Sequence, residues 1–119
     1  MDKKVILIVE DDPRVGESLR LLFKKKGYTT LLASNGKEAL HLFRQEMIDL
    51  VITDVVMPKM GGLELLEAVK GLKPETEVIV ISAQGTIEKA VQAMKLGAFD
   101  FIEKPINPRV LSLDRKSVV

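Results

Sequence analysis

Short runs of apolar residues, many of them β-branched, recur along the chain and predict five strands. A run that is apolar at nearly every position is typical of a strand buried on both faces of a parallel sheet. Each run is too short for a helix of ordinary length. The five predicted strands are Val5–Val9, Thr29–Ala33, Leu50–Thr53, Val78–Ile81 and Phe99–Ile102.

Between these runs, apolar residues are spaced three and four positions apart, as on one face of a helix. Proline favours the first turn of a helix and glycine its end. The predicted helices run from Asp12-Pro13 to Gly27, from Ser34 or Asn35, from about Gly62 to near Gly71, from after Gly85 to Gly97, and from Asn107-Pro108. The residues expected to face inward are Val15, Leu19, Leu22 and Phe23, then Ala39, Leu40, Phe43 and Met47, then Leu63, Leu66 and Val69, and finally Ile87, Ala90, Val91 and Met94.

Strands and helices therefore alternate five times, which predicts an α/β fold with a single doubly wound sheet. Strands that alternate with helices are joined by right-handed crossovers, so the five strands are parallel and helices cover both faces. In such sheets, functional groups gather beyond the carboxyl ends of the strands. Those ends are where candidate chemistry is to be sought.

Composition narrows the class of protein. The 119 residues suit one domain. The 18 basic and 17 acidic residues nearly balance, which argues against a nucleic-acid surface in this segment. There is no cysteine for a disulfide or a thiolate metal site. The first apolar stretch has five residues, too few for a signal peptide or membrane span, so a cytoplasmic location is expected.

The predicted strand ends carry most of the candidate chemistry. They are Glu10, Asp11 and Asp12 after the first strand, Asp54 after the third, Ser82 after the fourth, and Lys104-Pro105 after the fifth. Crowded carboxylates repel one another, and a hard cation such as Mg²⁺ relieves this through oxygen ligands and phosphate. Lysine binds phosphate as a point charge, and the serine hydroxyl can donate a hydrogen bond. Asp54 lies at the centre and is a candidate nucleophile for phosphoryl transfer.

The stretch after Asp54 predicts a sharp turn beside this site. It passes through Met57-Pro58 and Gly61-Gly62. We expect the turn to clear space for metal and phosphate, with glycine supplying unusual backbone angles at little steric cost.

With these residues in place, the sequence resembles a response-regulator receiver domain of two-component signalling. The resemblance rests on "VEDD", "DVVMPKMGG", "ISA" and "FIEKP", in this order and each on a strand end. The stretch "GTIEKAVQAMKLGAFDFIEKP" is most similar to receivers of sigma-54-dependent transcription activators. The resemblance covers nearly the whole chain and implies the flavodoxin-like strand order 2-1-3-4-5, which is also that of chemotaxis receivers.

The resemblance also implies a role for each site residue. Asp54 would accept a phosphoryl group from a histidine kinase, and Mg²⁺ would be bound by Asp11, Asp54 and the Val56 carbonyl, with Glu10 acting through water. Ser82 and Lys104 would bind phosphoryl oxygens. Phe101 takes the place of an aromatic switch residue, although a plain core role competes with this. The Lys104–Pro105 bond would be cis.

Three adjacent acids leave the alignment at the first strand open. Glu10-Asp11 is the expected metal-binding pair because it directly follows the strand, leaving Asp12 as a helix cap. The alternative pair is Asp11-Asp12. In either case Asp11 is retained.

Other functions on a similar fold are less consistent with these residues. A flavodoxin would cradle phosphate after the first strand, where this chain has three acids. A phosphatase of the haloacid-dehalogenase type needs an acid/base aspartate at the position of Val56. An unphosphorylated docking module would not need the complete set of site residues.

The expected protein is thus a signalling switch, not an enzyme. Residues 1–119 form one receiver domain, either standing alone or taken from a longer regulator. Its partners would be a sensor histidine kinase, an output domain or downstream partner, and optionally a second copy in a homodimer. Direct nucleic-acid and membrane contacts are not expected from this segment.

Overall fold

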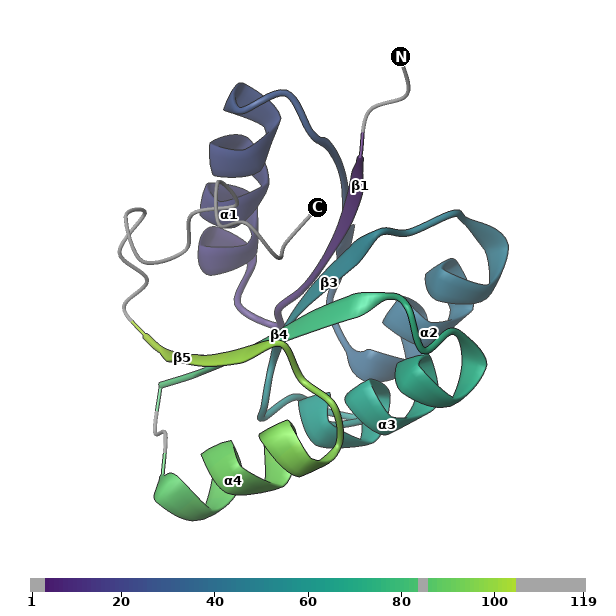
Figure 1. Cartoon of the computed structure of the whole chain (residues 1–119). Coiled ribbons are helices and arrows are strands. Elements are labelled where there is room, and N and C mark those ends of the chain that lie inside the picture. The colour runs from purple at the N-terminus through teal and green to yellow at the C-terminus, as the bar shows by residue number, and fades with distance from the viewer. Residues whose placement is uncertain (1–3, 84–85, 105–119) are drawn as a thin grey trace.

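The computed structural model describes residues 4–83 and 86–104, which form a parallel five-stranded sheet with helices between the strands (Figure 1). The elements follow in the order β1 (Val5–Val9), α1 (Pro13–Lys25), β2 (Thr29–Ala33), α2 (Gly36–Gln45), β3 (Leu50–Asp54), α3 (Gly62–Leu72), β4 (Glu77–Ser82), α4 (Ile87–Lys95) and β5 (Asp100–Glu103). The strand order is β2-β1-β3-β4-β5. This confirms the predicted doubly wound fold.

Two apolar cores lie on opposite faces of the sheet. On one face, α1 packs Leu19 and Phe23 against isoleucines of the central strands. On the other face, α2, α3 and α4 contribute Phe43, Leu66 and Ala93 to a second core. Figure 1 shows α1 on one side of the sheet and the other three helices on the opposite side. The central strands are therefore covered on both faces, as their continuous apolar runs predicted.

Capping side chains define where α1 and α2 begin. Asp12 precedes α1, and its carboxylate accepts a hydrogen bond from the Arg14 amide at 2.9 Å. Asn35 precedes α2, and its side-chain oxygen accepts a hydrogen bond from the Glu38 amide at 2.9 Å. The Glu38 carboxylate in turn accepts one from the Ser34 amide. Such reciprocal bonds satisfy amides that would otherwise have no partner at a helix start.

The predicted inward faces of α2 and α4 were partly wrong. Met47 is 82% exposed because α2 ends at Gln45, before the helical spacing reaches it. In α4, Ile87 is 84% exposed, and Val91 and Met94 are also exposed, while Ala93 is buried. Its small residues, not its large ones, face the sheet.

Some predictions fall on residues outside the described ranges. They concern the helix from Asn107-Pro108, the cis bond at Lys104–Pro105, and Gly85 before α4. Within the described ranges, every helix is too short or too polar to cross a membrane.

Candidate functional site

The pairing of the strands brings the predicted site residues to one edge of the sheet. Val9 lies opposite Thr53 in the β1–β3 pair, so Glu10 and Asp54 follow at the same level. Asp54 lies opposite Ile81, so Ser82 is one residue further along β4. Ser82 lies opposite Glu103, and Lys104 follows. The convergence expected from parallel topology is therefore present.

The Lys104 ammonium joins two strand-end carboxylates. Its Nζ atom lies 2.6 Å from Glu10 Oε1 and 2.8 Å from Asp54 Oδ2, and it donates a hydrogen bond to each. The side chains of Glu10, Asp54 and Lys104 are only 1%, 10% and 17% exposed. Ion pairs in such surroundings are screened little by salt. Lys104 is thus held at the centre of the site, and its amide also donates to the Ser82 carbonyl at 2.8 Å.

Burial and ion pairing shift the pKa values of Glu10 and Lys104 in opposite directions. Burial raises the pKa of the Glu10 carboxyl above its ordinary value, although the bond from Lys104 opposes this. Burial acts to lower the pKa of Lys104, but the hydrogen bonds to Asp54 and Glu10 outweigh it and hold that pKa above its ordinary value. The lysine therefore remains a cation throughout the neutral range.

Three carboxylates are arranged as a set of oxygen ligands. One oxygen each from Glu10, Asp11 and Asp54 lies within 4.8 Å of the others. Asp12 is instead occupied as the cap of α1, and its amide donates to Glu10 Oε2 at 3.1 Å. An all-oxygen set with one exposed member, Asp11, fits a hard cation that keeps some of its waters, as Mg²⁺ does.

The loop from Val55 to Gly61 turns back beside Asp54. The unusual backbone angle in this turn is not at a glycine, as the sequence had predicted. The one non-glycine residue with positive φ in the described ranges is Lys59, at 70°, whereas Gly61 has a φ of −75°. The glycines instead allow close approach, because a Cβ at Gly62 would lie 2.0 Å from the Asp54 carbonyl oxygen. A positive φ in a residue with a side chain costs about 1–3 kcal/mol and is often found at functional sites.

Ser82 and Phe101 lie on the paired strands β4 and β5, two residues apart in the register. Ser82 is 1% exposed at the end of β4. Phe101 lies opposite Val80 and is half-buried against the core shared with α2, α3 and α4. Beside its ring lies a cavity of about 240 Å³, lined by Thr86, Ile87, Ala90, Phe101 and Glu103. Phe101 thus packs against the core and also lines this cavity.

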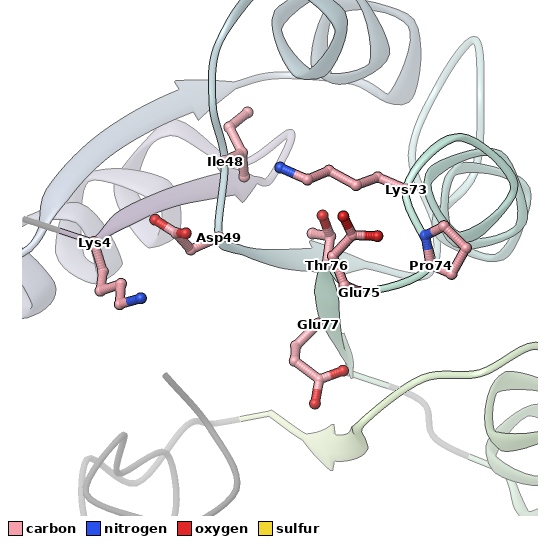
Figure 2. A pocket seen from close by; sticks show the side chains of 8 residues that line it. All are labelled: Lys4, Ile48, Asp49, Lys73, Pro74, Glu75, Thr76 and Glu77. Carbon is pink, nitrogen blue, oxygen red and sulfur yellow. The ribbon is translucent and has the colours of Figure 1, made fainter.

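A larger cavity, of about 490 Å³, lies elsewhere (Figure 2). Its lining residues are Lys4, Ile48, Asp49, Lys73, Pro74, Glu75, Thr76 and Glu77. They come from the amino ends of β1, β3 and β4, so none of the predicted site residues belongs to it. Within the described ranges, the Thr76 hydroxyl is the one buried side-chain polar atom that has no hydrogen-bond partner.

Comparison with known families identifies the family of this chain. The profile of the response regulator receiver domain matches residues 6–114. The chain is a response regulator receiver domain. Receiver domains belong to two-component signalling, so the resemblance carried by the strand-end residues is confirmed.

Relatives of this receiver include proteins named as a response regulator and as a regulatory protein. It is 38% identical over 107 residues to the response regulator protein PilR of Pseudomonas aeruginosa, and 39% identical over 108 residues to the regulatory protein AtoC of Escherichia coli. The matches cover 90% and 91% of this chain but only 24% and 23% of those proteins. This receiver thus spans about a quarter of the length of the curated relatives it matches.

Solved structures of receiver domains share its fold. A CheY-like receiver from Methanospirillum hungatei superposes with a TM-score of 0.89 at 34% identity, covering 92% of this chain and 88% of that one. A response regulator from Burkholderia pseudomallei, solved with a phosphorylated aspartic acid, a calcium ion and citrate, gives a TM-score of 0.85 at 29% identity. That match covers 91% of this chain and 64% of the other.

Proposed function

We propose that this receiver accepts a phosphoryl group on Asp54 from a sensor histidine kinase, in a reaction that requires Mg²⁺. The observation that carries the proposal is the Lys104 ammonium, which is hydrogen-bonded to both Asp54 and Glu10 within the carboxylate cluster. A buried cation beside a nucleophilic carboxylate is suited to binding a phosphoryl oxygen. The phosphorylated aspartic acid in the similar Burkholderia protein supports the same chemistry.

The residues that would hold Mg²⁺ are Asp11, Asp54 and the Val56 carbonyl, with Glu10 acting through a water molecule. The cation would neutralise charge on the phosphoryl oxygens when bound. The Val56 amide, 3.4 Å from Asp54 Oδ1, helps to orient the carboxylate. Asp11 is the most exposed of the three acids and would provide the entrance for a hydrated cation.

The transfer itself needs few groups. A carboxylate oxygen of Asp54 attacks phosphorus, the phosphorus–nitrogen bond to the kinase histidine breaks, and that nitrogen keeps the bonding electron pair. Lys104 holds one peripheral phosphoryl oxygen, and Ser82 donates a hydrogen bond to another. Buried Glu10 and Lys104 set the charge around Asp54 before the phosphoryl group arrives, which lowers the reorganisation needed during transfer.

Asp54→Asn tests the assignment of the nucleophile. We expect the wild-type chain to gain one phosphoryl group on treatment with acetyl phosphate and Mg²⁺, measured as a mass shift. The variant keeps the shape of the side chain but should gain none, because the amide is a poor nucleophile. Stoichiometric labelling of the variant at another residue would contradict the assignment. Asp49→Asn is a matched control, since Asp49 lies at the opposite edge of the sheet, and it should be labelled normally.

We further propose that residues 1–119 act as one receiver unit that reports to an output domain or a downstream partner, most simply in transcriptional regulation in the cytoplasm. The regulatory names of PilR and AtoC support this, as does the resemblance to receivers of sigma-54-dependent activators. Phosphorylation would draw Ser82 toward the phosphoryl group and turn Phe101 inward, changing the surface of α4. A homodimer through that surface is one way to pass on the change.

A further inference from the structure

The loop that follows Asp54 contains a strained turn. Lys59 has a φ of 70°, and the Met60 amide donates a hydrogen bond to the Pro58 carbonyl at 2.8 Å. A turn closed over three residues with positive φ at its centre is rare and unfavourable for a residue that has a Cβ. Strain of this kind persists only where neighbouring structure holds it in place.

The neighbouring structure that holds this turn is the first residue of α2. The Gly36 amide donates a hydrogen bond to the Met60 carbonyl at 3.2 Å. Gly36 is buried, and a Cβ there would lie 2.4 Å from that carbonyl oxygen and 2.6 Å from the Met60 Cβ. Only glycine lets the helix start approach the turn so closely.

The start of α2 is itself fixed relative to the site. The Asn35 side chain accepts a hydrogen bond from the Glu38 amide, and the Glu38 carboxylate accepts one from the Ser34 amide. These bonds tie the first turn of α2 to the residues that precede it. Strand β2, which leads into it, ends at Ala33, whose carbonyl accepts a hydrogen bond from the Glu10 amide at 3.0 Å. The Glu10 backbone is thereby hydrogen-bonded to the strand that leads into Gly36.

The loop held by Gly36 also positions Asp54. The Val56 amide faces Asp54 Oδ1, and the Gly62 amide donates to the Val55 carbonyl at 2.8 Å. A shift of Met60 would therefore move the backbone next to the phosphorylation site.

We propose that Gly36 is a positioning residue of this site, because its contact with Met60 holds the turn at Lys59 and, through it, the backbone of Val56 beside Asp54. The inference rests on the proposed function, since it takes Asp54 and Val56 as metal ligands. Gly36 contacts neither metal nor phosphoryl group.

Gly36→Ala tests this, with Gly71→Ala as the matched control. Gly71 also lies in a helix, but a Cβ there would meet no atom within 4 Å. We expect Gly36→Ala to weaken Mg²⁺ binding roughly tenfold, as loss of a group that supports a metal ligand typically does. Gly71→Ala should leave Mg²⁺ affinity unchanged. The measurement is Mg²⁺ titration followed by amide NMR shifts, alongside the thermal midpoint of each variant.

A second measurement uses the wild-type chain and does not depend on a variant folding. Coupling between two sites is reciprocal, so Mg²⁺ should strengthen the Gly36–Met60 contact. Hydrogen exchange of the Gly36 amide should slow when Mg²⁺ is added. The Gly27 amide, which donates to the Lys24 carbonyl after α1, should exchange at an unchanged rate.

The outcomes separate the role of Gly36 from the proposed function. Equal Mg²⁺ affinity for wild type and a folded Gly36→Ala, or Gly36 exchange that Mg²⁺ does not slow, would overturn the role of Gly36. Labelling of wild-type Asp54 by acetyl phosphate would leave the proposed function intact in that case. A wild type that binds no Mg²⁺ and takes no label would overturn the proposed function itself.

Discussion

We expect the side chain of Val56, two residues after Asp54, to lie beside the path that water takes to a phosphorylated Asp54. It is 65% exposed, and its branched apolar group offers water neither a donor nor an acceptor. Water that hydrolyses the phosphoryl group must approach in line with the bond from Asp54 to phosphorus. A residue that cannot orient this water should give a long-lived phosphorylated state, which suits transcription better than rapid control of motility.

Val56→Asn should therefore shorten that lifetime. An amide at this position can hold water in line, and a tenfold change in rate needs only about 1.4 kcal/mol. The test is the decay of phosphorylated protein at fixed Mg²⁺ and pH, wild type against variant. Met47→Asn, at a position that is 82% exposed and outside the site, is the control and should decay like the wild type. Decay of Val56→Asn at or below the wild-type rate would refute the argument about water access.

Replacing either of two buried threonines by valine should change the stability of the protein, in opposite directions. The Thr76 hydroxyl has no hydrogen-bond partner, whereas the Thr53 hydroxyl donates to the Asp54 carbonyl at 3.0 Å. Thr76→Val should raise the free energy of unfolding by about 1 kcal/mol, because it removes a buried polar group without losing a bond. Thr53→Val should lower it by about 1 kcal/mol, because it leaves an acceptor with one donor fewer. Denaturant unfolding measures both, and equal signs for the two variants would contradict this.

At the scale of elements, the prediction concerns how the site communicates with α4. Strand β4 links Ser82 to the core, β5 carries Phe101, and the cavity beside Phe101 is bounded by α4 residues. Beryllofluoride, which mimics a bound phosphoryl group, should shift amide NMR signals along β4, α4 and β5. If the domain exchanges between two conformations, a difference of a few kcal/mol in how tightly they bind beryllofluoride is enough to shift their populations.

The Asp54→Asn variant provides the control for this experiment and should show no such shifts. Shifts in the wild type that stay within the loops around Asp54 would mean that the site and α4 are not coupled.

The same elements show what the sequence could and could not predict. The inner strands β1, β3 and β4 were predictable because burial on both faces makes them apolar at nearly every position. For these strands the prediction did not depend on deciding which face points to the core. Which face of α4 points to the sheet was not predictable. Ile87, Val91 and Met94 form the more hydrophobic stripe, but Ala93 is the residue that packs inward. Close helix packing selected small side chains, which a pattern of large apolar residues does not reveal.

The site, like the helices and strands, was predictable only in part. Glu10, Asp54 and Lys104 could be placed together because the carboxyl ends of parallel strands share one edge. The contact of Gly36 with Met60 could not, because a glycine after Ser34-Asn35 fits any helix start. The turn at Lys59 was equally hidden, since the neighbouring glycines are the residues expected to take positive φ.

For the whole molecule, the prediction concerns pH. Burial raises the pKa of Glu10 above that of an unfolded chain, so the folded state binds a proton more tightly. The contribution of Glu10 to the free energy of unfolding is then highest at acid pH. It falls as the pH rises from the pKa of Glu10 in the unfolded chain to its pKa in the folded chain. Glu10→Gln removes the titrating group. In the absence of Mg²⁺, the wild type should lose stability relative to Glu10→Gln as pH rises above about 4.5, the ordinary pKa of a glutamate carboxyl.

Chemical unfolding at a series of pH values measures this difference. If the difference in unfolding free energy between the two proteins stays constant with pH, or changes in the opposite direction, burial does not set the pKa of Glu10. Lys104 should not disturb this interval, because its raised pKa places its own titration above 10.5, the ordinary pKa of a lysine.

The bond between Lys104 and Glu10 joins residues 94 positions apart in the chain. During synthesis, therefore, Glu10 leaves the ribosome roughly 5–20 s before the lysine that pairs with it, at ordinary elongation rates. Asp54 precedes Lys104 by 50 residues, so Glu10, Asp11 and Asp54 are all present without that lysine for about half of this interval. The carboxylate cluster lacks its buried lysine until the residue that follows β5 has been made, so the signalling site is among the last parts of the nascent domain to be completed.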